Sequence, residues 1–173
     1  MKATGKDLLL GGLFLALAIA IPVLFHAVGL GKAFLPMFFP IIISGFFIAF
    51  PAAVAVGVLS PLTSAFLTGM PPFYPPIVFV MMLEGLFLAG LPVLLYQKYK
   101  VSVWPTLIIT ILADRIVLLG SVFAISHWLD LPEKIIGAAS IIEGIPGVVL
   151  IFLLVPPVVR KLETRLEKIF IYE

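Results

Sequence analysis

The sequence predicts an all-α integral membrane protein with six transmembrane helices and cytoplasmic N- and C-termini, and three observations lead to this fold class. Of its 173 residues, 62% are hydrophobic and only 12% are charged, whereas soluble domains carry roughly 25% charged residues. Apolar runs of about 20 residues, long enough to cross a hydrocarbon core as a helix, recur along the whole chain. These runs also lack the alternation of apolar and polar residues that a membrane β-barrel strand requires.

Breaks in the apolar character define the individual helices. In lipid each backbone polar group needs a partner within the protein, and helices provide one. The predicted helices cover residues 7–25, 35–50, 52–68, 77–95, 104–125 and 138–158. No internal repeat and no linker divides the chain, so residues 1–173 are predicted to form a single transmembrane domain.

The basic residues set the predicted orientation. With the N-terminus inside, the inner segments hold eight of the 11 basic residues and the outer loops hold two, as the positive-inside rule requires. The eight inner residues are Lys2, Lys6, Lys98, Lys100, Arg160, Lys161, Arg165 and Lys168. Both termini are therefore predicted to be cytoplasmic. Residues 159–173 are expected to extend the last helix as an amphipathic cytoplasmic tail along the membrane surface.

The first apolar run, residues 7–25, resembles the hydrophobic part of a signal peptide, but no soluble domain follows it, and we interpret it as the first span. Within it, Gly12, Ala16 and Ala20 are spaced four residues apart. Such a stripe of small residues lets another helix approach closely. Two interpretations remain open at this point: close packing within the protein's own bundle, or docking of a partner helix.

The second and fourth helices flank a predicted pocket mouth. Pro36 and Pro40 indicate that helix 35–50 begins late or is broken at its outer end, because a proline inside a helix removes a hydrogen bond. Irregular backbone at that depth is tolerated where protein buries it or a watery cavity solvates it. The loop 69–76 lies on the same outer side and is stiffened by four prolines. These are Pro71, Pro72, Pro75 and Pro76.

Four charged residues fall inside the predicted spans, away from the first residue of any span. Glu84 is roughly 10–12 Å from the outer end of its helix at 1.5 Å per residue. Asp114 and Arg115 are near the middle of helix 104–125, and Glu143 is near the outer end of the last helix. Each costs several kcal/mol if it faces lipid, so we expect all of them to face the interior. They form either a structural ion-pair cluster or the polar lining of an outward-facing cavity.

The charge balance of this set bears on the second interpretation. Three acids against one arginine leave an excess of negative charge, so either one acid is protonated or a ligand supplies donors. Asp114 and Arg115 are adjacent and diverge by about 100° around the helix, so they need not pair with each other.

Aromatic residues are expected at the pocket mouth. Phe73 and Tyr74 lie in the proline-rich loop, and His127 and Trp128 lie between the last two helices. They act either as interfacial anchors in the aromatic belt or as a stacking surface for a flat ligand. No metal-ligand spacing, phosphate loop or nucleophile elbow is present. The sequence therefore predicts a non-enzymatic protein with no cofactor and no metal site.

Several segments resemble the substrate-binding S component of an energy-coupling factor (ECF) vitamin transporter. The stripe in the first helix, "LPMFFPIIISGFF", "GVLSPLTSAFLTGMPP", "MMLEG" and "EGIPGVVLIFLLVPPVVRKLE" are similar to stretches of vitamin-type S components. Together these stretches span nearly the whole chain. Phe38, after "LPM", stands where some relatives carry histidine.

The resemblance implies a receptor that binds a small water-soluble vitamin or vitamin precursor in an outward-facing pocket. Such receptors dock through the first helix onto a transmembrane T component that is coupled to two cytoplasmic ATPase subunits. On this chain Gly12, Ala16 and Ala20 become the docking stripe. The implied substrate contacts are Phe38, Phe73, Tyr74, Glu84, Arg115 and Glu143. The implied location is the plasma membrane of a prokaryote, with lipid but no nucleic acid as a further partner.

Two other classes of protein compete with this interpretation. A scaffold of the rod-shape-determining type is also small, six-helical and non-enzymatic, and it takes no ligand. An intramembrane enzyme needs paired catalytic groups at one depth, and Glu84 with Glu143 is the only possible pair.

Overall fold

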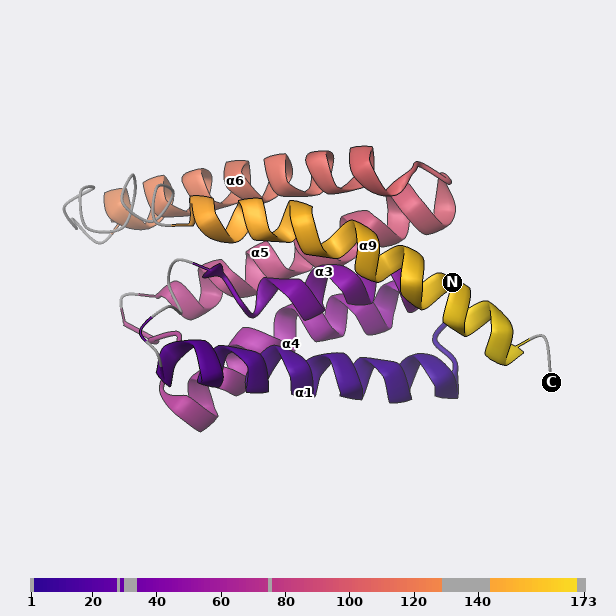
Figure 1. The fold of residues 1–173 in the computed structure, drawn as a ribbon. Helices are drawn as coiled ribbons and strands as arrows, with labels where there is room; N and C mark the ends of the chain where they lie inside the picture. The colour runs from indigo at the N-terminus through magenta and orange to yellow at the C-terminus, as the bar shows by residue number, and fades with distance from the viewer. Residues whose placement is uncertain (1, 28, 30–33, 75, 129–143, 171–173) are drawn as a thin grey trace.

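The computed structural model describes residues 2–27, 29, 34–74, 76–128 and 144–170, and within these residues every regular element is a helix. Figure 1 shows the helices side by side in one bundle. Their bounds are α1 (Gly5–Ala27), α3 (Phe38–Phe47), α4 (Phe50–Thr68), α5 (Ile77–Pro92), the π-helix η1 (Val93–Lys98), α6 (Val103–Trp128) and α9 (Ile145–Phe170). The prediction of an all-α fold is confirmed.

Five of the helices are long and apolar enough to cross a membrane: α1, α4, α5 with η1, α6 and α9. The remaining one, α3, has only 10 residues and spans about 15 Å at 1.5 Å per residue. Eight of those 10 residues are buried, so α3 is enclosed by protein instead of crossing on its own. The described part of the chain thus contains six apolar helices, of which five match the length of a span.

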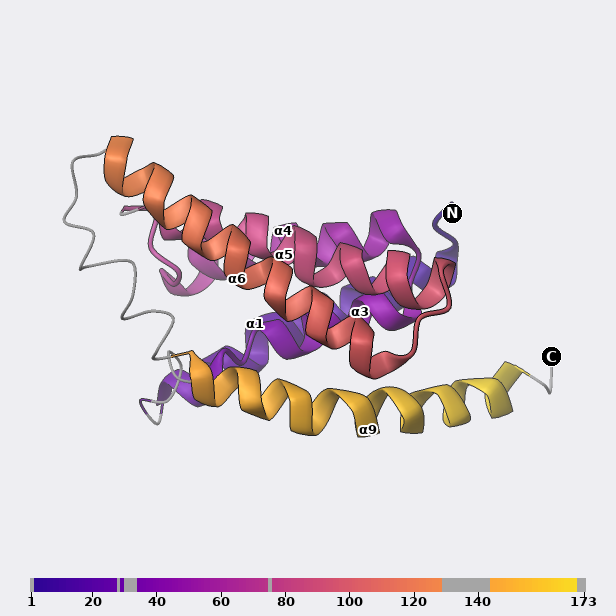
Figure 2. The ribbon, with the colours of Figure 1, turned by 90° about the horizontal axis from the view of Figure 1, so that it is seen from above.

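Helix α1 begins and α9 ends at the same end of the bundle (Figure 1). We call this end the base, and the opposite end, where α4 ends and α5 begins, the top. The chain returns to the base at the α3–α4 junction and again between η1 and α6. Figure 2 shows that α6 and α9 lie closer together at the base than at the top.

The tightest contact in the bundle lies between α4 and α5. A methyl group added to Gly57 would lie 2.1 Å from the carbonyl oxygen of Gly85, and one added to Gly85 would lie 2.1 Å from the carbonyl oxygen of Gly57. Pro61 lacks the N–H that would bond the Gly57 carbonyl within α4. That carbonyl therefore faces the Cα of Gly85, a geometry in which weak Cα–H···O contacts form between helices.

Helix α3 packs against the same helix by the same means. A methyl group on Gly45 would lie 2.3 Å from the carbonyl oxygen of Ala89, one turn beyond Gly85. Close backbone approach maximises the dispersion contacts that hold helices together in lipid. Helices α3, α4 and α5 thus form the core of the bundle, and their buried residues include Ile41, Ile42 and Leu88.

The junction between α3 and α4 is fixed by two side chains from other helices. The Ala49 N–H donates a 2.8 Å hydrogen bond to Oδ1 of Asp7 in α1. The Gln97 amide donates 2.9 Å bonds to the carbonyl oxygens of Gly45 and Ile48, which satisfies two of the free carbonyls at the end of α3. Asp7 also accepts bonds from the N–H and hydroxyl of Thr4, at 2.8 and 2.6 Å.

Prolines explain two departures from regular helix. Leu35 is in the left-handed region at φ 49° and α3 begins only at Phe38, so the predicted late start of this helix is confirmed. Immediately after Pro92 the turns widen into η1, because a proline cannot donate to the preceding turn and π-bulges absorb such defects.

The last helix extends beyond its predicted span. The chain continues as a single helix through Pro156 and Pro157 to Phe170, beyond residue 158 where the predicted span ends, as expected for a tail that extends the last helix. A proline leaves a backbone carbonyl of the preceding turn without its hydrogen bond. Membrane helices tolerate this because neighbouring groups donate to that carbonyl instead. The predicted start at residue 138 lies outside the described residues.

Candidate functional site

A cluster of charged side chains lies between α5 and α6, about halfway along the bundle. Arg115 donates from Nε and Nη2 to Oδ2 of Asp114, at 2.9 and 2.5 Å. Its Nη2 also lies 3.9 Å from Oε1 of Glu84 on α5. One guanidinium therefore bridges two carboxylates from two helices. Glu84 and Arg115, which the sequence predicts in the interior, lie together in this cluster.

The cluster is enclosed by protein. Glu84 is 3% exposed and Asp114 is fully buried, whereas the Arg115 side chain keeps 18% of its surface. Among the described residues, Oδ1 of Asp114 has no hydrogen-bond partner, and neither has Oγ1 of the fully buried Thr110, one turn earlier in α6. Buried polar groups normally find partners, so these atoms mark a place where the protein alone does not complete the bonding.

Asp114 and Arg115 pair with each other although they are neighbours in sequence. The sequence left this pairing open, because the two Cβ atoms diverge around the helix. The long guanidinium side chain folds back onto the Asp114 carboxylate and reaches Glu84 at the same time. Two carboxylates and one guanidinium leave a formal charge of −1 if both acids are ionised. Chemically, this arrangement favours a bound group that carries N–H or O–H donors.

The aromatic candidates lie in two different environments. Phe38 is 2% exposed and belongs to the apolar core of the bundle. At the top, Phe73 and Tyr74 are 42% and 74% exposed. The Phe73 ring lies against that of Phe66 in α4, with 5.2 Å between the ring centroids. The loop itself is tied to α4, since the Ser64 hydroxyl donates a 2.7 Å bond to the Met70 carbonyl.

Two other predicted groups complete the comparison with the sequence. Glu143 lies outside the described residues, so its predicted role as a substrate contact stays a prediction. His127 and Trp128 close α6 at the top, where Trp128 is 86% exposed and the His127 ring stacks on Phe123. Within the described part of the chain, no three histidine or acidic side chains gather as metal ligands.

The small residues of α1 face away from the bundle. Gly12, Ala16 and Ala20 are all exposed, and a methyl group on Gly12 would meet nothing within 4 Å. Phe14 and Ala18, on the other face of the helix, are 8% and 0% exposed. The interpretation that this stripe packs within the protein's own bundle is therefore wrong, and its docking interpretation stays a prediction.

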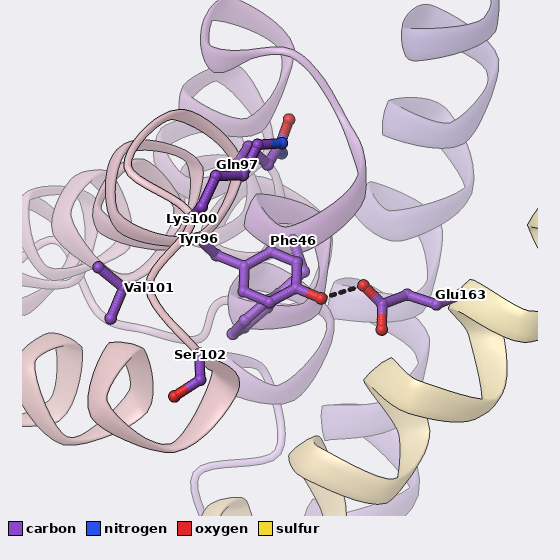
Figure 3. A pocket seen from close by; sticks show the side chains of 7 residues that line it. All are labelled: Phe46, Tyr96, Gln97, Lys100, Val101, Ser102 and Glu163. Atoms are coloured by element: carbon purple, nitrogen blue, oxygen red, sulfur yellow. Dashed lines mark hydrogen bonds between the residues drawn. The ribbon is translucent and has the colours of Figure 1, made fainter.

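Sequence reasoning missed a polar hollow at the base. It has a volume of about 520 Å³ and is lined by Phe46, by Tyr96 and Gln97 of η1, by residues 100–102 and by Glu163 of α9. Figure 3 shows the Tyr96 hydroxyl pointing at the Glu163 carboxylate, to which it donates a hydrogen bond. The sequence carries one signal for this site, namely polar residues where the apolar run 77–95 ends.

Comparison with known proteins adds no relative. No protein-family model, no curated protein and no solved structure matches the chain.

Proposed function

We propose that this protein is the substrate-binding subunit of an ECF-type vitamin importer, which takes up a small water-soluble vitamin or vitamin precursor. The observation that carries the proposal is the Glu84–Arg115–Asp114 cluster with its two unpartnered oxygens. Ionisable residues within membrane spans are costly and commonly mark functional sites, substrate pathways among them. A vitamin rich in donors supplies the missing hydrogen bonds and balances the excess negative charge.

The exposed stripe of α1 supports the second half of the proposal. Gly12, Ala16 and Ala20 form a smooth face that the bundle leaves uncovered. In lipid such a face allows a second helix to approach closely, and the resulting van der Waals contacts stabilise the pair. We assign it to the transmembrane T component, which is coupled to two cytoplasmic ATPases. In this proposal the base faces the cytoplasm of a prokaryote, the top faces outward, and the subunit itself is not an enzyme.

The ligand half is tested with the full-length protein purified in detergent. Native mass spectrometry should detect a retained small molecule after expression in a rich medium. Glu84→Gln and Arg115→Lys, which preserve the size or the charge of the side chain, should each lower its occupancy at least about tenfold. Lys98→Ala, an exposed change at the base, is the matched control. A full complement of ligand in both cluster variants, or a protein that never retains one, contradicts the assignment.

The docking half is tested separately. Ala16→Leu adds a bulky side chain to the exposed stripe of α1 and should abolish co-purification with a T component and ATPases. Ligand occupancy should stay unchanged, because the residue is remote from the cluster. Ala124→Leu makes the same change at an exposed position of α6 and should leave assembly intact. Equal co-purification of both variants would contradict docking through α1.

A membrane scaffold of the rod-shape-determining type is the second candidate, and one observation favours it. The Arg115 guanidinium bonds Asp114 of its own helix at 2.5 Å and lies 3.9 Å from Glu84 of α5, and a charge-assisted bridge of this kind suits a purely structural clamp between α5 and α6. A scaffold retains no small molecule, so the mass spectrometry described above separates the two candidates.

A further inference from the structure

The polar hollow at the base has a chemistry that the proposed function does not use. Its lining carries one cation and one anion, Lys100 and Glu163, together with the hydroxyl groups of Tyr96 and Ser102. In the described part of the chain no ion pair joins Lys100 to Glu163. Both charges therefore line the same space without neutralising each other.

Two contacts hold the wall of this hollow in place. The Phe46 ring meets the Tyr96 ring edge-on at 4.9 Å, and the Tyr96 hydroxyl donates to Oε1 of Glu163 (Figure 3). The carboxylate is thereby oriented toward η1, while its second oxygen, Oε2, can accept from another donor. On the other side, Gln97 is held by its bonds to the end of α3.

The hollow also lies at a defined depth. Residues 99–102 join two membrane-length helices, one ending at Lys98 and the next beginning at Val103. Such junctions coincide with the headgroup region, which surrounds a hydrocarbon core of roughly 30 Å. A volume of about 520 Å³ falls in the usual range for a small-ligand site.

We propose that this hollow binds a phosphodiester that carries a primary ammonium group, and that its occupant is the headgroup of phosphatidylethanolamine. The Lys100 ammonium binds the phosphate oxygens, as lysine commonly does. The ammonium group of the headgroup donates to Oε2 of Glu163. The bound headgroup ties η1 to α9 at the base. This site is independent of the proposed vitamin site in the cluster.

The test uses the full-length protein in detergent with defined added lipids, and native mass spectrometry counts the lipids retained. Phosphatidylethanolamine should be retained at least about fivefold better than phosphatidylcholine, whose quaternary ammonium has no N–H to donate to a carboxylate. Lys100→Asn and Glu163→Gln should each remove this preference. Asparagine is chosen because Lys100 has φ 57°, a left-handed conformation that asparagine tolerates.

Matched controls and a soluble ligand complete the design. Lys98→Ala removes a neighbouring lysine that lies over the Tyr99 ring, 5.3 Å from its centroid, and should keep the preference. If Glu163→Gln fails to fold, the lipid preference of Lys100→Asn decides the test, because Lys100 is exposed and its replacement should not disturb folding. Equal retention of the two lipids, or variants that behave like Lys98→Ala, overturns the site. Glycerophosphoethanolamine that binds as tightly as the lipid overturns the lipid as occupant and assigns the hollow to a soluble zwitterion.

Discussion

Gly57 of α4 and Gly85 of α5 face each other so closely that a methyl group on either would lie 2.1 Å from the other's carbonyl oxygen. The contact is made by backbone on both sides, so no flexible side chain can move aside to make room. Two helices that approach in this way gain many dispersion contacts over a long stretch. Residues that touch no ligand therefore determine how well the core of the bundle is held together.

Gly85→Ala should separate α4 from α5 and lower the free energy of unfolding by about 2–3 kcal/mol, the upper range for an overpacked core. The measurement is thermal or denaturant unfolding of the purified protein in detergent. Gly120→Ala is the matched control, because a methyl group there meets nothing within 4 Å. We expect that variant to be neutral or slightly stabilised. A Gly85→Ala protein as stable as Gly120→Ala would contradict the contact.

Removing the guanidinium of the cluster should destabilise the protein, because two buried carboxylates lose their counter-charge. Arg115→Gln should cost roughly 3 kcal/mol. In double-mutant cycles Arg115 should couple more strongly to Asp114, whose oxygen is 2.5 Å from Nη2, than to Glu84 at 3.9 Å. The measurement is the unfolding free energy of the single and double variants with Asp114→Asn and Glu84→Gln. The reverse order of coupling would show that the bridging geometry is wrong.

Asp7 joins the start of α1 to the α3–α4 junction. Asp7→Ala removes acceptors for the Thr4 N–H and hydroxyl and for the Ala49 N–H, and should cost about 1–2 kcal/mol. Thr4→Ala affects only the bonds at the start of α1, so it should cost less. The difference in unfolding free energy between the two variants gives the joint contribution of the bonds from the Thr4 N–H and the Ala49 N–H, which Thr4→Ala keeps and Asp7→Ala removes. Equal losses would mean that the bond to Ala49 contributes nothing.

Gln97 is predicted to stabilise the base through the carbonyls of Gly45 and Ile48. Gln97→Leu keeps a similar volume but leaves two carbonyl oxygens without donors, which should cost about 1–3 kcal/mol. Hydrogen exchange at the end of α3 should rise in this variant, because the junction opens more often. Lys98→Ala, one residue further along, should change neither quantity. Unchanged exchange at the end of α3 in Gln97→Leu would show that its amide does not hold the junction.

The spans could be predicted from sequence because the cost of exposing backbone to lipid forces continuous apolar helices. The late start of α3 also followed from Pro36, since a proline constrains the residues around it. The helical extension of the last span was also predicted, because the residues after 158 form an amphipathic pattern, and α9 continues to Phe170.

The candidate site could be predicted only in part. Glu84 and Arg115 were expected in the interior because of their cost in lipid, and both lie in one cluster. The bond between Asp114 and Arg115 depends on the conformation of a long side chain, which spacing alone does not determine. The partnership of Tyr96 with Glu163 joins residues 67 positions apart. Only the folded topology brings such residues together.

The glycines that pack the helices of the bundle together are not the small residues that the sequence pattern singled out. The stripe on α1 is exposed, whereas the close contacts use Gly45, Gly57 and Gly85. Four-residue spacing of small side chains identifies a face that permits close approach. It does not say which neighbour uses that face.

Glu84 directly precedes Gly85 in α5, so its backbone lies beside the close glycine contact between α4 and α5. Its counter-ion, Arg115, belongs to α6, which contributes no residue to that contact. If the proposed ligand binds between these two side chains, a shift of α6 would accommodate it at lower cost than a separation of α4 from α5.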